Sequence, residues 1–191
     1  MESRLFQALK AFKGADGCEA NLFKEFKKIA EEAFFSGYFL VNGGCKDAYK
    51  LKLTCIEFYY HEDDGNIKDE KKCLKGKDEF GYALGAVCPN PSGVDVLFDD
   101  PQKKYHASFL IRGYKAIVPG EKIGRIMKKE KIGLLMIFGM IYLVEQKMLS
   151  NGKFCIEWID ESDETLGYAE PMQRININDN RLWGFKRVEK L

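Results

Sequence analysis

The chain has 191 residues, of which 46% are hydrophobic and 13% aromatic, and its 30 basic and 29 acidic residues give a net charge of +1. This length is typical of one domain, and the apolar content is ample for a packed core, which excludes a mainly disordered chain. The near-neutral balance also lacks the global basicity that is usual for nucleic-acid-binding proteins.

The charges are unevenly distributed along the chain. Nine Lys or Arg and two Glu lie between Gln102 and Lys131, whereas eight acidic residues and five lysines lie between Glu57 and Glu79. The basic stretch could steer a polyanion onto one face of the molecule, or it could be the solvated surface of a helix. Composition alone leaves both interpretations open.

Apolar residues recur at helical spacing in residues 1–36, which we expect to be mainly helical and to pack on a sheet. The first helix is predicted to stop at Gly14 and Gly17. The second is predicted to run from about Asn21, a favourable capping residue, to Phe35, just before Gly37. The apolar positions that define the two helices are Leu5, Phe6, Leu9 and Phe12, and then Leu22, Phe23, Phe26, Ile29, Ala30, Ala33 and Phe34.

The rest of the chain is predicted to be rich in strands, because β-branched and aromatic residues gather in short runs between turn residues. A basic helix near 121–130 and an apolar helix at 132–149 are expected to interrupt them. The predicted strands cover residues 38–41, 49–60, 94–98, 108–114, 154–159, 174–177 and 182–188. The expected fold is therefore a single α+β domain over 1–191, with an antiparallel curved sheet or partly open barrel and flanking helices.

Two observations bear on the compartment. The uncharged run from Ile132 to Val144 has 13 residues, whereas a spanning helix needs about 20, so we expect a buried helix and no membrane partner. The first eleven residues lack the apolar core of a signal peptide, and the six cysteines include no CxxC pair. We therefore expect a cytoplasmic protein with reduced thiols.

Common catalytic motifs are absent from the sequence. It contains no P-loop, no GxGxxG after a strand, no HExxH and no GxSxG, and it has two histidines. These absences argue against a nucleotide-binding loop, a histidine-rich metal site and a serine-hydrolase elbow. We expect no metal and no cofactor.

The segment Ile56-Glu57-Phe58-Tyr59-Tyr60-His61 is the most informative cluster. Within a strand, Glu57 and Tyr59 point to one face, and Phe58 and Tyr60 to the other. A carboxylate held among aromatic side chains is suited to activating water. The alternative is an edge-strand Glu that faces solvent, and spacing alone favours that alternative.

Five segments in order resemble the alkylpurine (3-methyladenine) DNA glycosylases. Residues 55–59 are similar to that family's Glu-x-Glu-Ala-Tyr element, with its second Glu at Glu57 and its Tyr at Tyr59, and 33–41 to its Ala-x-x-Leu-Leu-Gly-x-x-Leu-Val entry to the sheet. Residues 109–113 resemble its Val-Leu-Leu-Arg-Ala strand, and Asp95 falls near an Asn of the family. Residues 173–177 and 181–185 resemble its Pro-Arg-Val-Gly-Ile and Pro-Trp-Arg-Phe segments.

The resemblance implies a monofunctional hydrolase that flips a damaged purine out of double-stranded DNA and releases it. Glu57 would activate water, Asp95 would help to position it, and Tyr59 would stack on the base, with Tyr60 or His61 closing the pocket. The resemblance suggests as phosphate contacts Arg112, Lys115, Arg125, Arg174 and Arg187.

The sequence also departs from this family. The Asp-x-Ala-Ser-His segment after the Tyr is missing, a Tyr-rich wedge is not evident around 80–92, and the apolar segment 132–149 replaces part of the basic, Gly-rich region. Two alternatives therefore stand beside the enzyme. One is an inactive nucleic-acid or small-ligand binding domain on the same fold. The other is an interaction module that forms a homo-oligomer through 132–149.

Overall fold

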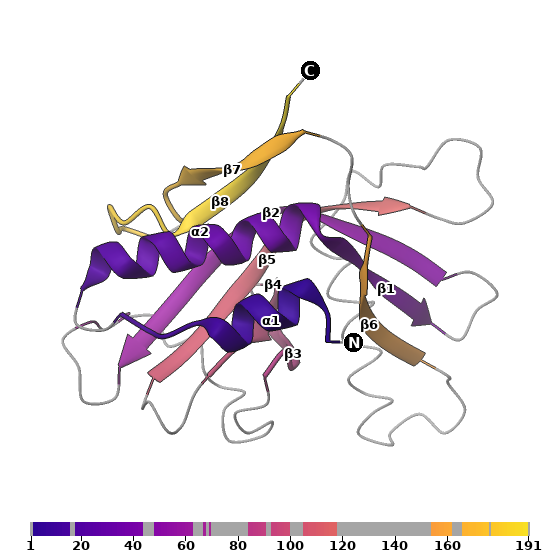
Figure 1. The fold of residues 1–191 in the computed structure, drawn as a ribbon, viewed down its shortest axis with the longest axis horizontal. Helices are drawn as coiled ribbons and strands as arrows, with labels where there is room; N and C mark the ends of the chain where they lie inside the picture. The colour runs from indigo at the N-terminus through magenta and orange to yellow at the C-terminus, as the bar shows by residue number, and fades with distance from the viewer. Residues whose placement is uncertain are drawn as a thin grey trace.

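The computed structural model describes residues 2–15, 18–43, 48–62, 67, 69, 84–90, 93–99, 105–117, 154–161, 166–175 and 177–190. In this part of the chain, two helices lie on one face of an eight-stranded sheet, and every strand pairing is antiparallel (Figure 1). The α+β class and the open antiparallel sheet expected from the sequence are confirmed.

In the described residues, the elements follow one another as two helices and then eight strands. The helices are α1 Arg4–Ala11 and α2 Glu19–Phe35. The strands are β1 Gly37–Gly43, β2 Ala48–Glu62, β3 Val87–Asn90, β4 Gly93–Leu97, β5 Tyr105–Ile117, β6 Phe154–Asp160, β7 Gly167–Met172 and β8 Gly184–Glu189.

Both helices form where the sequence predicts them. Ser3 caps α1, because its side chain accepts a hydrogen bond from the Phe6 amide at 3.3 Å. The apolar stripe of α2 faces the sheet, with Leu22, Phe26, Ile29, Ala30, Ala33 and Phe34 buried. Helix α2 begins at Glu19, two residues before the predicted capping residue Asn21, and it ends at Phe35, as predicted.

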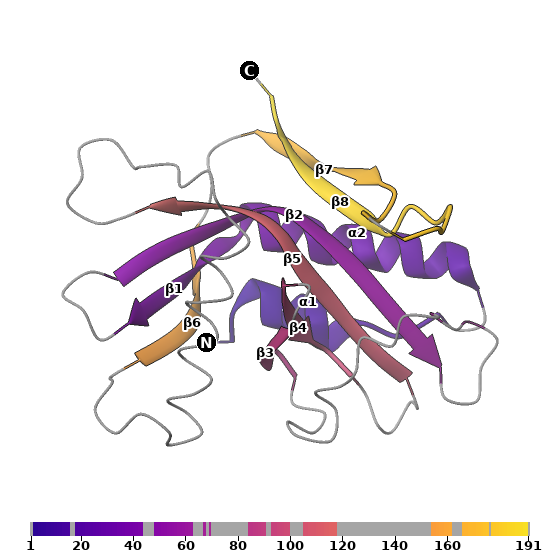
Figure 2. The ribbon, with the colours of Figure 1, turned by 180° about the vertical axis from the view of Figure 1, so that it is seen from behind.

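Strand β2 is the centre of the sheet and divides it into two branches. One edge of β2 pairs with β5 along most of its length, and the order continues to β4 and β3. The other edge pairs with β1 near Leu51 and with β8 near Glu57, so that the β1–β6 pair and the β7–β8 hairpin leave it in different directions (Figure 2). Helix α2 contacts strands of both branches.

A bulge interrupts the pairing of β2 with β5 next to Glu57. Leu53 is opposite Tyr114, Cys55 is opposite Gly113, and Ile56 is opposite Ile111, so the register skips Thr54 on one strand and Arg112 on the other. A Cβ on Gly113 would lie 2.8 Å from Oγ1 of Thr54. Glycine therefore allows the close approach of the two strands, and the bulge redirects the side chains beside it.

The two faces of β2 differ in chemistry. Towards the helices, Phe58 stacks on Phe26 with ring centroids 4.4 Å apart, in a core that also contains Ile56, Phe109 and Trp183. The opposite face carries polar side chains that are nonetheless buried, namely Glu57, Asp95, Asp99, His106 and Ser108. Buried polar groups require partners, so this second face holds the candidate site.

Several sequence predictions need correction. The predicted strand 174–177 is not a strand in its described residues, and β7 lies outside every predicted strand. Strand β3 also lies outside the predicted strands. The predicted helices 121–130 and 132–149, with Arg125 and the proposed oligomer segment, lie outside the described residues.

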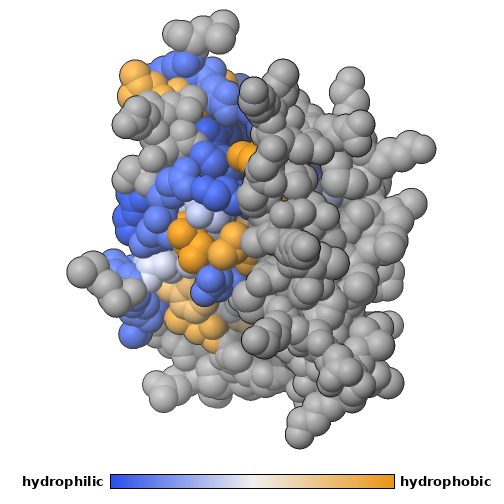
Figure 3. Space-filling model, turned by 90° about the vertical axis from the view of Figure 1, so that its right-hand side faces the viewer, coloured by the Kyte–Doolittle hydropathy of each residue, from blue (hydrophilic) through white to orange (hydrophobic). Residues whose placement is uncertain are grey.

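On the side of the molecule at the right of Figure 1, the visible described residues form a hydrophilic area with a smaller hydrophobic area beside it (Figure 3). Among the residues that the structure describes, no helix is both long and apolar enough to cross a membrane. The large hydrophobic side chains that are exposed are Ile117, Leu166, Tyr168, Ile175 and Leu182.

Candidate functional site

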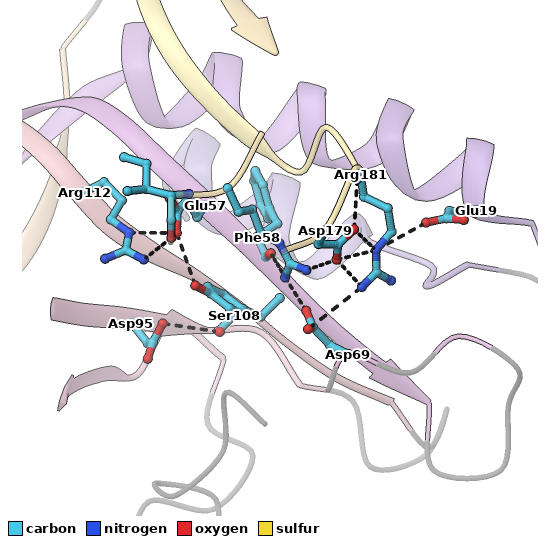
Figure 4. A network of polar contacts seen from close by, with 12 residues as sticks. Glu19, Glu57, Phe58, Asp69, Asp95, Ser108, Arg112, Asp179 and Arg181 are labelled. Carbon is cyan, nitrogen blue, oxygen red and sulfur yellow. Dashed lines mark hydrogen bonds and ion pairs between the residues drawn. The ribbon is translucent and has the colours of Figure 1, made fainter. Parts of the chain in front are cut away.

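Glu57 lies on the polar face of β2 and is fully buried. Its Oε2 accepts hydrogen bonds from Nε of Arg112 at 2.7 Å and from the hydroxyl of Tyr59 at 3.2 Å (Figure 4). Its Oε1 accepts a hydrogen bond from the backbone amide of Ile175 at 2.6 Å. Three donors therefore fix the orientation of one carboxylate.

The donors come from three different elements. Tyr59 is two residues beyond Glu57 on β2 and shares its face, as the strand periodicity predicts. Arg112 is the residue that the bulge leaves unmatched on β5. Ile175 follows β7, and its carbonyl oxygen lies 3.5 Å from Nη2 of Arg112. Arg112 therefore contacts both the carboxylate of Glu57 and the backbone of Ile175. These contacts close a ring of Glu57, Arg112 and Ile175.

Counting the described residues, this arrangement leaves Glu57 one acceptor position. A carboxylate can accept about four hydrogen bonds, two at each oxygen. Oε2 already accepts two and Oε1 accepts one. A water or hydroxyl group bound at the second position of Oε1 would face a carboxylate that is held by its other donors, as general-base chemistry requires.

Tyr59 acts as a donor to this carboxylate. Burial raises the pKa of Tyr59 above its ordinary value, and the nearby negative charge of Glu57 raises it further. The hydroxyl therefore keeps its proton and donates a hydrogen bond to Glu57. The guanidinium carbon of Arg174 lies 5.1 Å from the centre of the Tyr59 ring, so the predicted stacking of a base needs the other face of the ring.

Asp95 shares the polar face with Glu57. Asp95 on β4 is opposite Leu110 on β5, which is opposite Glu57 on β2. Since neighbouring strands are about 4.8 Å apart, the two acidic residues are separated by about 10 Å between backbones. The Oγ of Ser108 lies 3.5 Å from Oδ1 of Asp95, and Ser108 is opposite Tyr59 in the pairing of β5 with β2.

The structure separates Tyr60 from this group. The Tyr60 side chain is buried on the helix face, where its hydroxyl accepts from the amide of Ala15 at 2.9 Å and donates to Glu62 at 2.9 Å. Tyr60 therefore does not close a pocket around Glu57. His61 does lie on the Glu57 face, where its ring stacks on that of His106 with centroids 6.3 Å apart.

The predicted phosphate contacts are mostly engaged within the protein. Arg112 is paired with Glu57, and the side chain of Arg174 is fully buried between Asp69 and Asp179. The burial of Arg174 corrects its prediction as a surface contact. Arg187 donates to the carbonyl of Phe34 at 2.6 Å, and exposed Lys115 pairs with Glu189 at 3.1 Å. Arg125 lies outside the described residues.

A second ionic network borders the first (Figure 4). The Nε of Arg181 donates to both carboxylate oxygens of Asp179, to Oδ1 at 3.0 Å and to Oδ2 at 2.8 Å. This hydrogen bonding holds the pKa of Asp179 well below its ordinary value. The ring of Trp183 is flanked by the guanidinium groups of Arg181 at 4.0 Å and Arg174 at 5.2 Å.

Sequence reasoning missed Ile175, Asp69 and the paired role of Asp179. The contact of Ile175 uses its backbone, for which the sequence carries no side-chain signal. Asp179 stands in the sequence Asn178-Asp179-Asn180, whose residue types favour a turn and give no sign of a charged partner.

Within the described ranges, no group of three or more His, Cys, Asp or Glu is arranged to hold a metal ion. No protein-family model, curated protein or solved structure matches this chain.

Proposed function

We propose that this protein is an N-glycosylase that releases an alkylated purine from DNA, with Glu57 as the general base. The observation that supports this proposal best is the buried Glu57 carboxylate, which three donors orient and which retains one acceptor position on Oε1. The resemblance of residues 55–59 and 109–113 to the alkylpurine glycosylases points to the same Glu and Arg.

In the proposed reaction, the damaged nucleotide leaves the base stack and enters the site. Glu57 accepts a proton from water, and the water oxygen bonds to the anomeric carbon of the sugar. The bond from that carbon to the purine nitrogen breaks, and its electron pair leaves with the base. A purine with a positive charge from alkylation becomes neutral as it departs, so it needs no protonation by the protein.

Tyr59 and Asp95 have supporting roles in this proposal. Tyr59 donates to Glu57, and its ring, which is 7% exposed, would have to open to the base for stacking. Asp95, on the same face, helps to hold water or the cationic base. A pocket with two carboxylates would attract a positively charged purine more than a neutral one.

The test is base release from methylated duplex DNA, measured as abasic sites that alkali converts to strand breaks. We expect release by the wild-type protein and by Glu31→Gln, which removes an exposed carboxylate on α2 paired with Lys27. Glu57→Gln should lower base release by about 100-fold or more. The absence of abasic sites with the wild-type protein, while an established alkylpurine glycosylase works under the same conditions, would refute the proposal.

A second candidate is a domain that binds a small purine ligand without cleaving DNA. It is favoured by the engagement of Arg174 and Arg187 with groups of the protein itself. Fluorescence binding at two salt concentrations separates the candidates: duplex DNA binding that weakens steeply with salt indicates phosphate contacts, whereas salt-independent binding of a purine nucleoside indicates a small-ligand site.

A further inference from the structure

Arg174 is an arginine whose side chain is fully buried, and its two terminal nitrogens and its guanidinium plane have partners. Its Nη1 donates to the carbonyl of Phe58 at 3.3 Å and pairs with Asp69, and its Nη2 pairs with Asp179. Its guanidinium also faces the rings of Tyr59 and Trp183. A buried charge with this many partners is costly to rearrange, so its position is well determined.

The location of Arg174 connects it to Glu57 in two ways. The next residue in the chain is Ile175, whose amide donates to Oε1 of Glu57 at 2.6 Å. The ring that Arg174 faces is that of Tyr59, whose hydroxyl donates to Oε2. Two of the three donors to Glu57 are thus one contact or one peptide bond away from Arg174.

Arg174 also supplies a hydrogen-bond donor at the edge of β2, just beyond the pairing with β8. Strand β8 pairs with Cys55, Ile56 and Glu57, and the amide of Phe58 donates to the carbonyl of Trp183 at 2.8 Å. The carbonyl of Phe58 accepts from Arg174. The guanidinium therefore attaches the segment after β7 to β2 immediately beside Glu57.

From these contacts we infer that Arg174 is a positioning residue, which holds the amide of Ile175 and the ring of Tyr59 against Glu57. This inference rests on the proposed function for its catalytic consequence only, because the geometry can be tested without any substrate. Arginine suits the position because its planar fork reaches two carboxylates and a carbonyl at once, whereas a lysine ammonium is a single point charge.

The experiment compares Arg174→Lys with the wild-type protein by two measurements. The first is the amide proton resonance of Ile175 in the ligand-free protein, which a short hydrogen bond to a carboxylate shifts downfield. Glu57→Gln supplies the reference for the loss of that acceptor. The second is the kinetics of base release, where a misplaced general base lowers kcat by about tenfold to 100-fold and leaves KM nearly unchanged.

Arg181→Lys is the matched control. Arg181 shares Asp179 and the Trp183 ring with Arg174, but its neighbours in the chain do not donate to Glu57. We expect Arg174→Lys to move the Ile175 resonance towards its position in Glu57→Gln and to lower kcat. We expect Arg181→Lys to leave the Ile175 resonance near its wild-type position.

An Ile175 resonance that stays at its wild-type position in folded Arg174→Lys would overturn the inference, whatever the activity. If Arg174→Lys does not fold, Asp179→Asn is used instead, because it weakens the ion pair of Arg174 with Asp179. An Ile175 resonance that stays at its wild-type position in Asp179→Asn would likewise overturn the inference. If the wild-type protein releases no base, the proposed function fails, while the resonance of Ile175 still decides the positioning role.

Discussion

Arg112 reaches Glu57 because a β-bulge leaves it unmatched in the register of β2 and β5, and its Nε lies 2.7 Å from Oε2 of Glu57. The exposed fraction of the Arg112 side chain is 9%, and that of Glu57 is 0%. The ion pair is therefore largely out of water, where the loss of one partner leaves the other charge uncompensated.

The first prediction concerns Glu57→Gln. Base release should fall by about 100-fold or more, because the amide cannot accept a proton from water. The variant should also lose about 3 kcal/mol of its free energy of unfolding, because Arg112 remains buried without its counter-charge. Urea denaturation measures this loss, with Glu31→Gln as the control for an exposed carboxylate. Base release at the wild-type rate would show that another group is the base.

The second prediction concerns the coupling of Glu57 with Arg112. Arg112→Met should destabilise the protein, but the double variant Glu57→Gln/Arg112→Met should be about 1–3 kcal/mol more stable than the sum of the two single effects predicts. The reason is that the second substitution removes the charge that the first left unpaired. Free energies of unfolding for the four proteins measure the coupling. Additive effects would mean that the pair contributes little in solution.

The sequence predicted the side-chain directions in β2 correctly. A strand has a period of two residues, so Glu57 and Tyr59 had to share a face and Tyr60 had to point away from them. The hydrogen bond from Tyr59 to Glu57 and the burial of Tyr60 beside Ala15 confirm this. Local periodicity was sufficient here because the strand is regular from Ile56 to Glu62.

The partners of Glu57 could not be derived in the same way. The contact of Arg112 depends on a bulge, for which Gly113 is the only local sign in the sequence. The contact of Ile175 depends on a non-strand conformation where the sequence predicted a strand. Arg174 and Asp69 are 105 positions apart. Such pairings depend on the tertiary fold, which a local pattern does not encode.

The third prediction concerns alkaline pH. Burial, followed by the charge of Glu57, raises the pKa of Cys55 from 9.0 to about 11. Burial also raises the pKa of Tyr59 above 10.0. The folded protein therefore holds protons that the unfolded chain has released, so this stability is complete below pH 9.0 and is lost as the pH rises to about 11 and beyond.

Thermal unfolding followed from neutral to alkaline pH measures the effect. Cys55→Ser and Tyr59→Phe should each make the decline in Tm shallower, because each removes one raised pKa from the folded protein. Cys18, which is exposed, serves as the control, and Cys18→Ser should leave the decline unchanged. A decline as steep in both test variants as in the wild-type protein would contradict the assignment.

The fourth prediction concerns Asp179 and acid pH. Hydrogen bonds from Arg181 lower the pKa of Asp179 below its ordinary value of 3.8. A lowered pKa in the folded state adds stability that is present above 3.8 and disappears as the pH falls below it. Asp179→Asn should therefore cost about 1–2 kcal/mol at neutral pH, a value reduced for the partial exposure of the side chain.

The same substitution should cost less as the pH falls below 3.8, because the unfolded wild-type chain then binds a proton at Asp179, whereas the folded protein, with its lowered pKa, still holds that carboxylate ionised. Urea denaturation of both proteins at about pH 7 and about pH 3 measures the two differences. Glu31→Gln, whose carboxylate is exposed, should show a small difference at both values. If the difference for Asp179→Asn stayed constant, the contribution of Asp179 would come from packing and not from its charge. The network around Arg174 would then not be held by the charge of Asp179.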